Sequence, residues 1–147
     1  MTKIILAVDG SEPSLAATRA LIKHHAMFIG PVRIHIIHVS APIPRLYGMH
    51  IVVDGTTIEK IIREDAELAM SSSRILLDKA GLAYKCAHFV GEVAHTINDN
   101  AAVHEADFIY VGARGQGAIR GAILGSTTMK LLQTTKTPLV VIHATEH

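Results

Sequence analysis

Five short runs of apolar, largely β-branched residues recur along the 147-residue chain, and their spacing constrains the fold more than any other feature. The runs cover residues 3–8, 32–39, 84–90, 107–111 and 138–143. Runs of this length and composition are typical of strands that are covered on both faces, as in a parallel sheet. The sequence therefore predicts five buried strands.

Helical patterns occupy the intervals between these runs. They predict helices over residues 14–25, 57–80, 93–105 and 126–134. Ser11 is suited to cap the first helix, Pro13 suits its first turn, and Gly81 suits the C-terminal end of the second. The resulting alternation of strand and helix predicts right-handed crossovers and a doubly wound α/β sandwich in a single domain, residues 1–147.

The segment 40–56 fits neither pattern, because two prolines interrupt it and Asp54-Gly55 resembles a turn. It is compatible with a small hairpin or with a flap that faces a partner.

Composition and charge favour a soluble cytoplasmic protein. Hydrophobic residues make up 49% of the chain, which argues against disorder, and the formal net charge of +1 provides no broad basic field for nucleic acid or an anionic membrane. The N-terminal apolar run is too short for a signal peptide or a membrane span. Cys86 is the single cysteine, and we expect it to be buried in a strand. One cysteine cannot form an intrachain disulfide, which fits a reducing compartment.

We expect a ligand-binding site where the strands end, because ligands of open parallel sheets bind beyond the carboxyl ends of the strands. The first strand ends in Val8-Asp9-Gly10-Ser11, the second in His38-Val39, and the fourth in Val111-Gly112. These three strand ends are therefore the candidate binding region.

A glycine-rich stretch follows the fourth strand and suits a phosphate group. Gly112 and Gly115 allow backbone amides to come close to a bulky anion, and Gly125 precedes a predicted helix whose N-terminus favours negative charge. Ser126 and Thr127 add hydroxyl groups, and Arg114 suits pairing with phosphate oxygens. Neither a P-loop nor a dinucleotide fingerprint is present in the sequence.

The histidines do not predict a built-in metal site. His35 and His38 are three apart on a predicted strand, so their side chains point to opposite faces. His143 and His147 are four apart, but they lie at and after the end of the last predicted strand and not on a predicted helix.

The spacing Gly112-x2-Gly115-x9-Gly125-Ser126 resembles the nucleotide-binding motif of the universal stress protein family. The resemblance extends over the whole chain, from the opening strand with Asp9 to the closing strand before His143. It implies an open five-stranded parallel sheet of order 3-2-1-4-5, Rossmann-like and similar to the adenine nucleotide alpha hydrolases, with helices on both faces.

The resemblance also implies a ligand and its contacts. Nucleotide-binding members hold ATP, so Asp9 would lie near the ribose or a metal-bound triphosphate, and Mg²⁺ or Mn²⁺ would arrive with the nucleotide. Val39 would meet adenine through its backbone, Gly112 and Gly115 would face the ribose and phosphates, and Gly125 to Thr127 would hold the phosphate chain. Thr127 and Arg114 stand where the family often has Val and His.

Three functions remain open at this point. The first is an ATP-binding regulator of a stress response that forms a homodimer through Leu139, Val140, Val141 and Ile142, as members of the family commonly do. The second is a slow ATPase or phosphotransferase, for which Asp9 and Ser126 are the only candidates. The third is an interaction module that needs no nucleotide.

Overall fold

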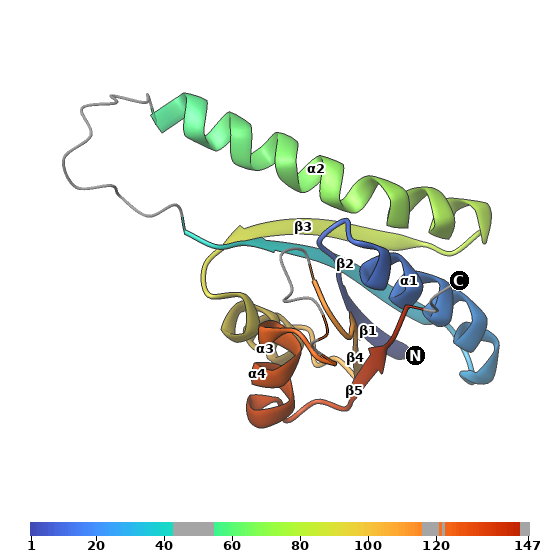
Figure 1. Cartoon of the computed structure of the whole chain (residues 1–147). Coiled ribbons are helices and arrows are strands. Elements are labelled where there is room, and N and C mark those ends of the chain that lie inside the picture. Colours follow the sequence, from blue (N-terminus) through green and yellow to red (C-terminus); the bar gives the residue numbers. More distant parts are fainter. Residues whose placement is uncertain (43–54, 116–120, 122, 145–147) are drawn as a thin grey trace.

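The computed structural model describes residues 1–42, 55–115, 121 and 123–144 (Figure 1). The strands are β1 (Thr2–Ala7), β2 (Val32–Ser40), β3 (Tyr84–Val90), β4 (Phe108–Gly112) and β5 (Leu139–Ile142). The helices are α1 (Glu12–His24), the short 3-10 helix η1 (His25–Met27), α2 (Gly55–Lys79), α3 (Val93–Val103) and α4 (Ser126–Thr134).

The strands form one parallel sheet in the order β3-β2-β1-β4-β5, which confirms the predicted topology. Helices α1 and α2 lie on one face, and α3 and α4 lie on the other (Figure 1). All strands therefore end at the same edge of the sheet, and that edge brings together the turns expected to carry the chemistry.

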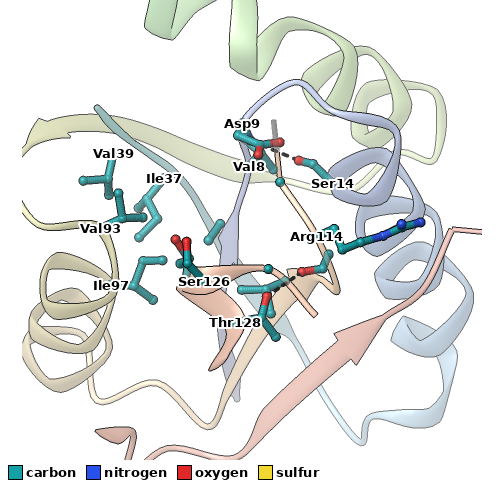
Figure 2. Close-up of a pocket in the computed structure, with 16 residues that line it drawn as sticks. Val8, Asp9, Ser14, Ile37, Val39, Val93, Ile97, Arg114, Ser126 and Thr128 are labelled. Atoms are coloured by element: carbon teal, nitrogen blue, oxygen red, sulfur yellow. Dashed lines mark hydrogen bonds between the residues drawn. The ribbon is translucent and has the colours of Figure 1, made fainter. Parts of the chain in front are cut away.

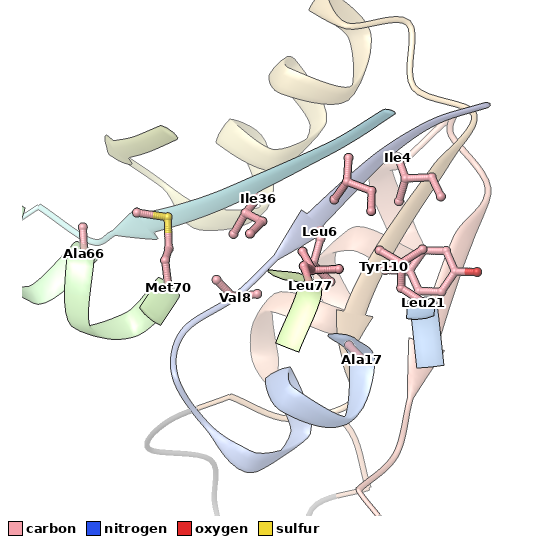
Figure 3. Close-up of a cluster of buried hydrophobic side chains, with 11 residues drawn as sticks. Ile4, Leu6, Val8, Ala17, Leu21, Ile36, Ala66, Met70, Leu77 and Tyr110 are labelled. Carbon is pink, nitrogen blue, oxygen red and sulfur yellow. The ribbon is translucent and has the colours of Figure 1, made fainter. Parts of the chain in front are cut away.

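The core has two halves because side chains alternate across the sheet. Ile4 and Leu6 of β1 pack toward α1 and α2 (Figure 3), whereas Ile5 between them packs toward α3 and α4, and all three are fully buried. The prediction that the strands are covered on both faces is thus confirmed for β1, whose neighbours β2 and β4 flank it.

Helix α1 begins two residues before the predicted start, and Ser11 caps it as expected, its hydroxyl accepting from the Ser14 N–H. A buried hydrogen bond of 2.8 Å between the hydroxyls of Thr18 and Ser73 joins α1 to α2. At the end of α2, Gly81 adopts a positive φ of 69°, as a C-terminal glycine should.

The prediction of a buried third strand is wrong. β3 forms one edge of the sheet, and its residues 85–88 are exposed. Cys86 is exposed as well, contrary to the expectation of a buried thiol. An apolar strand signal does not distinguish an edge strand from a central one, because both need the same local conformation.

The structure shortens the irregular segment at both ends. Ser40 belongs to β2, and Gly55 and Thr56 begin α2. The hairpin or flap predicted for the remainder falls on residues 43–54, which lie outside the described residues. None of the described helices combines the length and the apolar character needed to cross a membrane.

The two faces of α2 provide a direct test of the core. Leu77 is fully buried, whereas Leu68 on the same helix is 74% exposed. We expect Leu77→Ala to lower the free energy of unfolding by about 2–5 kcal/mol because it leaves a cavity. Leu68→Ala, the matched control, should change it by less than about 0.5 kcal/mol. Urea unfolding followed by circular dichroism measures both, and equal losses would contradict the placement of α2.

Candidate functional site

A cavity of about 280 Å³ opens at the carboxyl ends of β1, β2 and β4 (Figure 2). The glycine-rich stretch and the first turns of α3 and α4 complete its wall. It therefore lies where the fold predicts a ligand site.

Nine of the predicted site residues line this cavity. They are Val8, Asp9, Val39, Gly112, Arg114, Gly115, Gly125, Ser126 and Thr127. The other two, Gly10 and Ser11, follow Asp9 in the turn and are not among the lining residues.

The turn after β1 holds the carboxylate of Asp9 in place. The backbone N–H of Ser11 donates to Asp9 Oδ1 at 2.9 Å, and the Ser11 hydroxyl donates to the same oxygen. The Asp9 N–H in turn donates to Ser14 Oγ at 3.2 Å. Ser11 therefore both caps α1 and orients Asp9. Although Ser11 does not line the cavity, it supports Asp9, which does.

A Cβ added at either of two motif glycines would lie less than 3 Å from a neighbouring residue. A Cβ at position 112 would lie 2.6 Å from the carbonyl carbon of Pro13, in the first turn of α1. A Cβ at position 115 would lie 2.5 Å from Asp9 Oδ2. Glycine at these positions lets α1 pack against the end of β4 and lets the β4 loop pass directly beside the Asp9 carboxylate.

The N-terminus of α4 borders the cavity without a side-chain cap. Gly125 is its N-cap residue and has an extended backbone, and the Gly125 N–H donates to Ala113 O at 2.8 Å. Thr128 donates from its hydroxyl to Gly112 O at 3.0 Å, which ties the first turn of α4 to the end of β4. The first amides of a helix have no partners within the helix, so this terminus suits an anion.

Arg114 does not extend into the cavity. Figure 2 shows its side chain directed away from the other labelled residues, while its backbone neighbours Ala113 and Gly115 remain beside Gly125. The guanidinium would have to swing round to meet a phosphate in the cavity.

The opposite side of the cavity is apolar, and the sequence reasoning found only part of it. Ile37 and Val39 of β2 gather there with Val93 and Ile97 of α3 (Figure 2). The signal for Ile37 is its position two residues before Val39, on the same face of the strand. The sequence predicted that Val93 and Ile97 belong to a helix over residues 93–105, but not that they form a ligand surface.

Four further lining residues were also not predicted. They are Ala7, Ser14, Val111 and Thr128. Each lies next to a predicted residue in the sequence, or one helical turn from one. Their small side chains have no sequence pattern that would mark them as ligand contacts.

The arrangement suits a ligand with a flat apolar part and an anionic part. Apolar side chains of β2 and α3 form one side of the cavity, and Asp9 with the N-terminus of α4 forms the other. Within the part of the chain that the structure describes, no group of three or more His, Cys, Asp or Glu side chains is placed to hold a metal ion.

The sequence of residues 1–143 matches the model of the universal stress protein family. The chain belongs to this family. A curated relative from Mycolicibacterium smegmatis, also a universal stress protein, is 29% identical over 147 residues, covering 95% of this chain. This chain spans about half of that relative's length, 47%.

Solved structures share the fold. The hypothetical protein MJ0577 superposes with a TM-score of 0.81 at 19% identity, covering 99% of this chain and 98% of that one. A universal stress protein in complex with cAMP gives 0.69 at 19% identity, covering 98% of both chains. The universal stress protein from Archaeoglobus fulgidus in complex with dAMP gives 0.64 at 21%, covering 97% of this chain and 98% of that one.

The contact between Gly112 and Pro13 predicts a stability effect that involves no ligand. We expect Gly112→Ala to lower the free energy of unfolding by about 1–3 kcal/mol, because the added methyl group overlaps backbone atoms of α1. Gly55→Ala is the control, since nothing lies within 4 Å of a Cβ at that position. Thermal unfolding of the two variants measures the difference, and a Gly112→Ala protein as stable as the wild type would contradict the close approach.

Proposed function

We propose that this universal stress protein binds ATP in the cavity at the strand ends and acts as a nucleotide-dependent regulator. The adenine ring lies against Val39, Ile37 and the apolar residues of α3. The ribose and phosphates run past Asp9 toward Gly125, Ser126 and Thr127, where backbone amides and the N-terminus of α4 meet the negative charge.

One observation carries the proposal. A Cβ at Gly112, the last residue of β4, would overlap the Pro13 backbone, and a Cβ at Gly115 would meet the Asp9 carboxylate, so the chain at positions 112–115 runs alongside both Asp9 and Gly125. Glycine positions allow backbone amides to come close to a phosphate group, and the N-terminus of α4 favours its negative charge. Fold relatives in complex with cAMP and dAMP support an adenine nucleotide as the ligand class.

A divalent cation would enter with the triphosphate. Asp9 is the carboxylate that lines the cavity, and carboxylates and phosphate oxygens are the ligands that Mg²⁺ prefers. Asp9 would therefore accept a hydrogen bond from either a ribose hydroxyl or a metal-bound water.

Regulation requires that two states of the protein bind the nucleotide unequally. We place the coupling in a homodimer formed through β5. Residues 139–142 are each half-buried, and β5 is an edge strand in the described sheet. An edge strand of this kind can pair with a second copy.

An exposed single cysteine is compatible with a reducing compartment, so we assign the protein to the cytoplasm.

Binding is tested with Gly115→Val. The valine side chain would displace the Asp9 carboxylate or the loop, because its Cβ alone would lie 2.5 Å from Asp9 Oδ2. We expect the ATP affinity measured by calorimetric titration to fall at least tenfold, a loss of about 1.4 kcal/mol. The control is Gly55→Ala, at a position that does not line the cavity and leaves room for a Cβ, and it should bind as the wild type does. Equal affinities in wild type and Gly115→Val would contradict the proposal.

The same samples separate binding from hydrolysis. Phosphate release that is absent in the wild type fits a regulator that only binds. Release that depends on Asp9, and is lost in Asp9→Ala, would move the assignment to a slow ATPase.

The dimer is tested by placing a charge on β5. We expect Val140→Lys to shift the protein from dimer to monomer in sedimentation velocity, because a second copy that covers β5 would remove the water that still reaches this half-buried position. Ile29→Lys, at a position that is 96% exposed, is the control and should stay dimeric. Circular dichroism verifies that both variants fold. A Val140→Lys protein that sediments as the wild type would exclude this interface.

A further inference from the structure

A cluster of basic side chains lies on the α3 face of the sheet, away from the strand ends that carry the cavity. Arg33 and His35 lie two residues apart on one face of β2, Lys85 pairs in register with His35 on β3, and His104 follows the end of α3. We call these four residues the basic cluster. Three elements therefore direct cationic groups to one place.

The two histidines at the centre are stacked. The ring centroids of His35 and His104 lie 4.0 Å apart with an interplanar angle of 29°. Two imidazolium ions in this arrangement would repel each other, so the stack favours at least one neutral ring when the site is empty.

The surroundings of His35 contain positive charge from three neighbouring side chains. The pKa of His35 is lowered, first by burial and then by the charges of His104, Lys85 and Arg33. None of the ion pairs between described residues involves Arg33 or Lys85. Glu105, next to His104 in the chain, is engaged by Lys3 of β1 at 3.1 Å.

The cluster is accessible from solvent along the edge of the sheet. Arg33 and Lys85 are exposed, and Ala87, two residues after Lys85 on the same face of β3, is exposed as well. β3 is also the terminal strand, so one side of its backbone has no neighbouring strand in the described sheet. An extended chain can bind such an edge through its backbone and meet the adjacent side chains with its own.

We propose that the basic cluster is a docking site for an extended acidic segment of a partner protein, separate from the nucleotide cavity. Carboxylates of the segment pair with Arg33 and Lys85 and accept hydrogen bonds from His35 and His104. The charge is local: the whole chain carries a formal net charge of only +1. A compact group of this kind matches a few carboxylates better than the long, uniform charge of a nucleic acid backbone.

The proposal implies a dependence on pH. In the free protein the pKa of His35 is lowered, so His35 is mostly neutral near pH 7. Bound carboxylates favour the charged form of both rings, so binding takes up protons and the affinity must rise as the pH falls. The groups that face His35 are Arg33 on its own strand, Lys85 on β3 and His104 after α3, with the Lys3–Glu105 pair beside them.

The test uses the full-length protein and a labelled peptide of about eight alternating Glu and Ser residues, long enough to lie along one strand. Fluorescence anisotropy should show tighter binding of this peptide than of a matched Gln-Ser peptide. The affinity should rise at least about threefold from about pH 7.5 to about pH 6, and the His35→Gln/His104→Gln protein should lose that rise.

Charge-matched variants locate the site. Arg33→Gln/Lys85→Gln should weaken peptide binding roughly threefold to tenfold. Lys23→Gln/Arg63→Gln removes the same charge from exposed positions on α1 and α2, on the other side of the sheet, and should bind as the wild type does. Gly115→Val should also retain peptide binding, so a failure of the nucleotide proposal is distinguishable from a failure of this one.

Three results would overturn the proposal. Equal affinity for the Glu-Ser and Gln-Ser peptides would show that carboxylates are not recognised. Equal losses in the two charge-matched variants would show that binding follows net charge and not the basic cluster. Tighter binding of a single-stranded DNA of the same charge would assign the cluster to nucleic acid.

Discussion

The turn after β1 approaches the end of β4 and the loop that follows it so closely that a Cβ at Gly112 or Gly115 would overlap a neighbouring residue. The Pro13 backbone occupies the space beside Gly112, and the Asp9 carboxylate occupies the space beside Gly115. The parallel pairing of β1 with β4 creates this approach, because it brings both strands to an end at the same edge of the sheet. Without it, Asp9 and the N-terminus of α4 would not border one cavity.

Several contacts that stabilise the fold also shape the binding site. Ser11 caps α1 and orients Asp9, and Thr128 in the first turn of α4 donates to the carbonyl of Gly112. Helix α3 likewise covers the sheet with Ile97 and lines the apolar side of the cavity with it. A ligand that binds here therefore depends mainly on the backbone and on core residues, and little on groups that could be recognised in isolation.

The sequence predicted the architecture well because local patterns and topology agree. Alternating strand and helix signals predicted a doubly wound α/β sandwich, and the resemblance to the family supplied the strand order that the structure has. The strand ends and the glycine spacing, together with that resemblance, led to most of the cavity lining. The apolar residues Ile37 and Val93 were missed as ligand contacts, since a side chain that packs in a core and one that packs against a ring are the same residue types. The burial of β3 and of Cys86 was predicted wrongly, because the position of a strand in a sheet depends on long-range pairing.

The most direct test of the account follows the backbone amides themselves. In a nuclear magnetic resonance titration of ¹⁵N-labelled protein with ATP, the largest amide shift changes should occur at Val39, at Gly112 and Gly115, and over residues 125–127. The amides of the exposed face of α2, such as Leu68, should stay unchanged. A spectrum that does not respond to saturating ATP, or that changes mainly around Arg33 and Lys85, would contradict the claim that the strand ends hold the nucleotide.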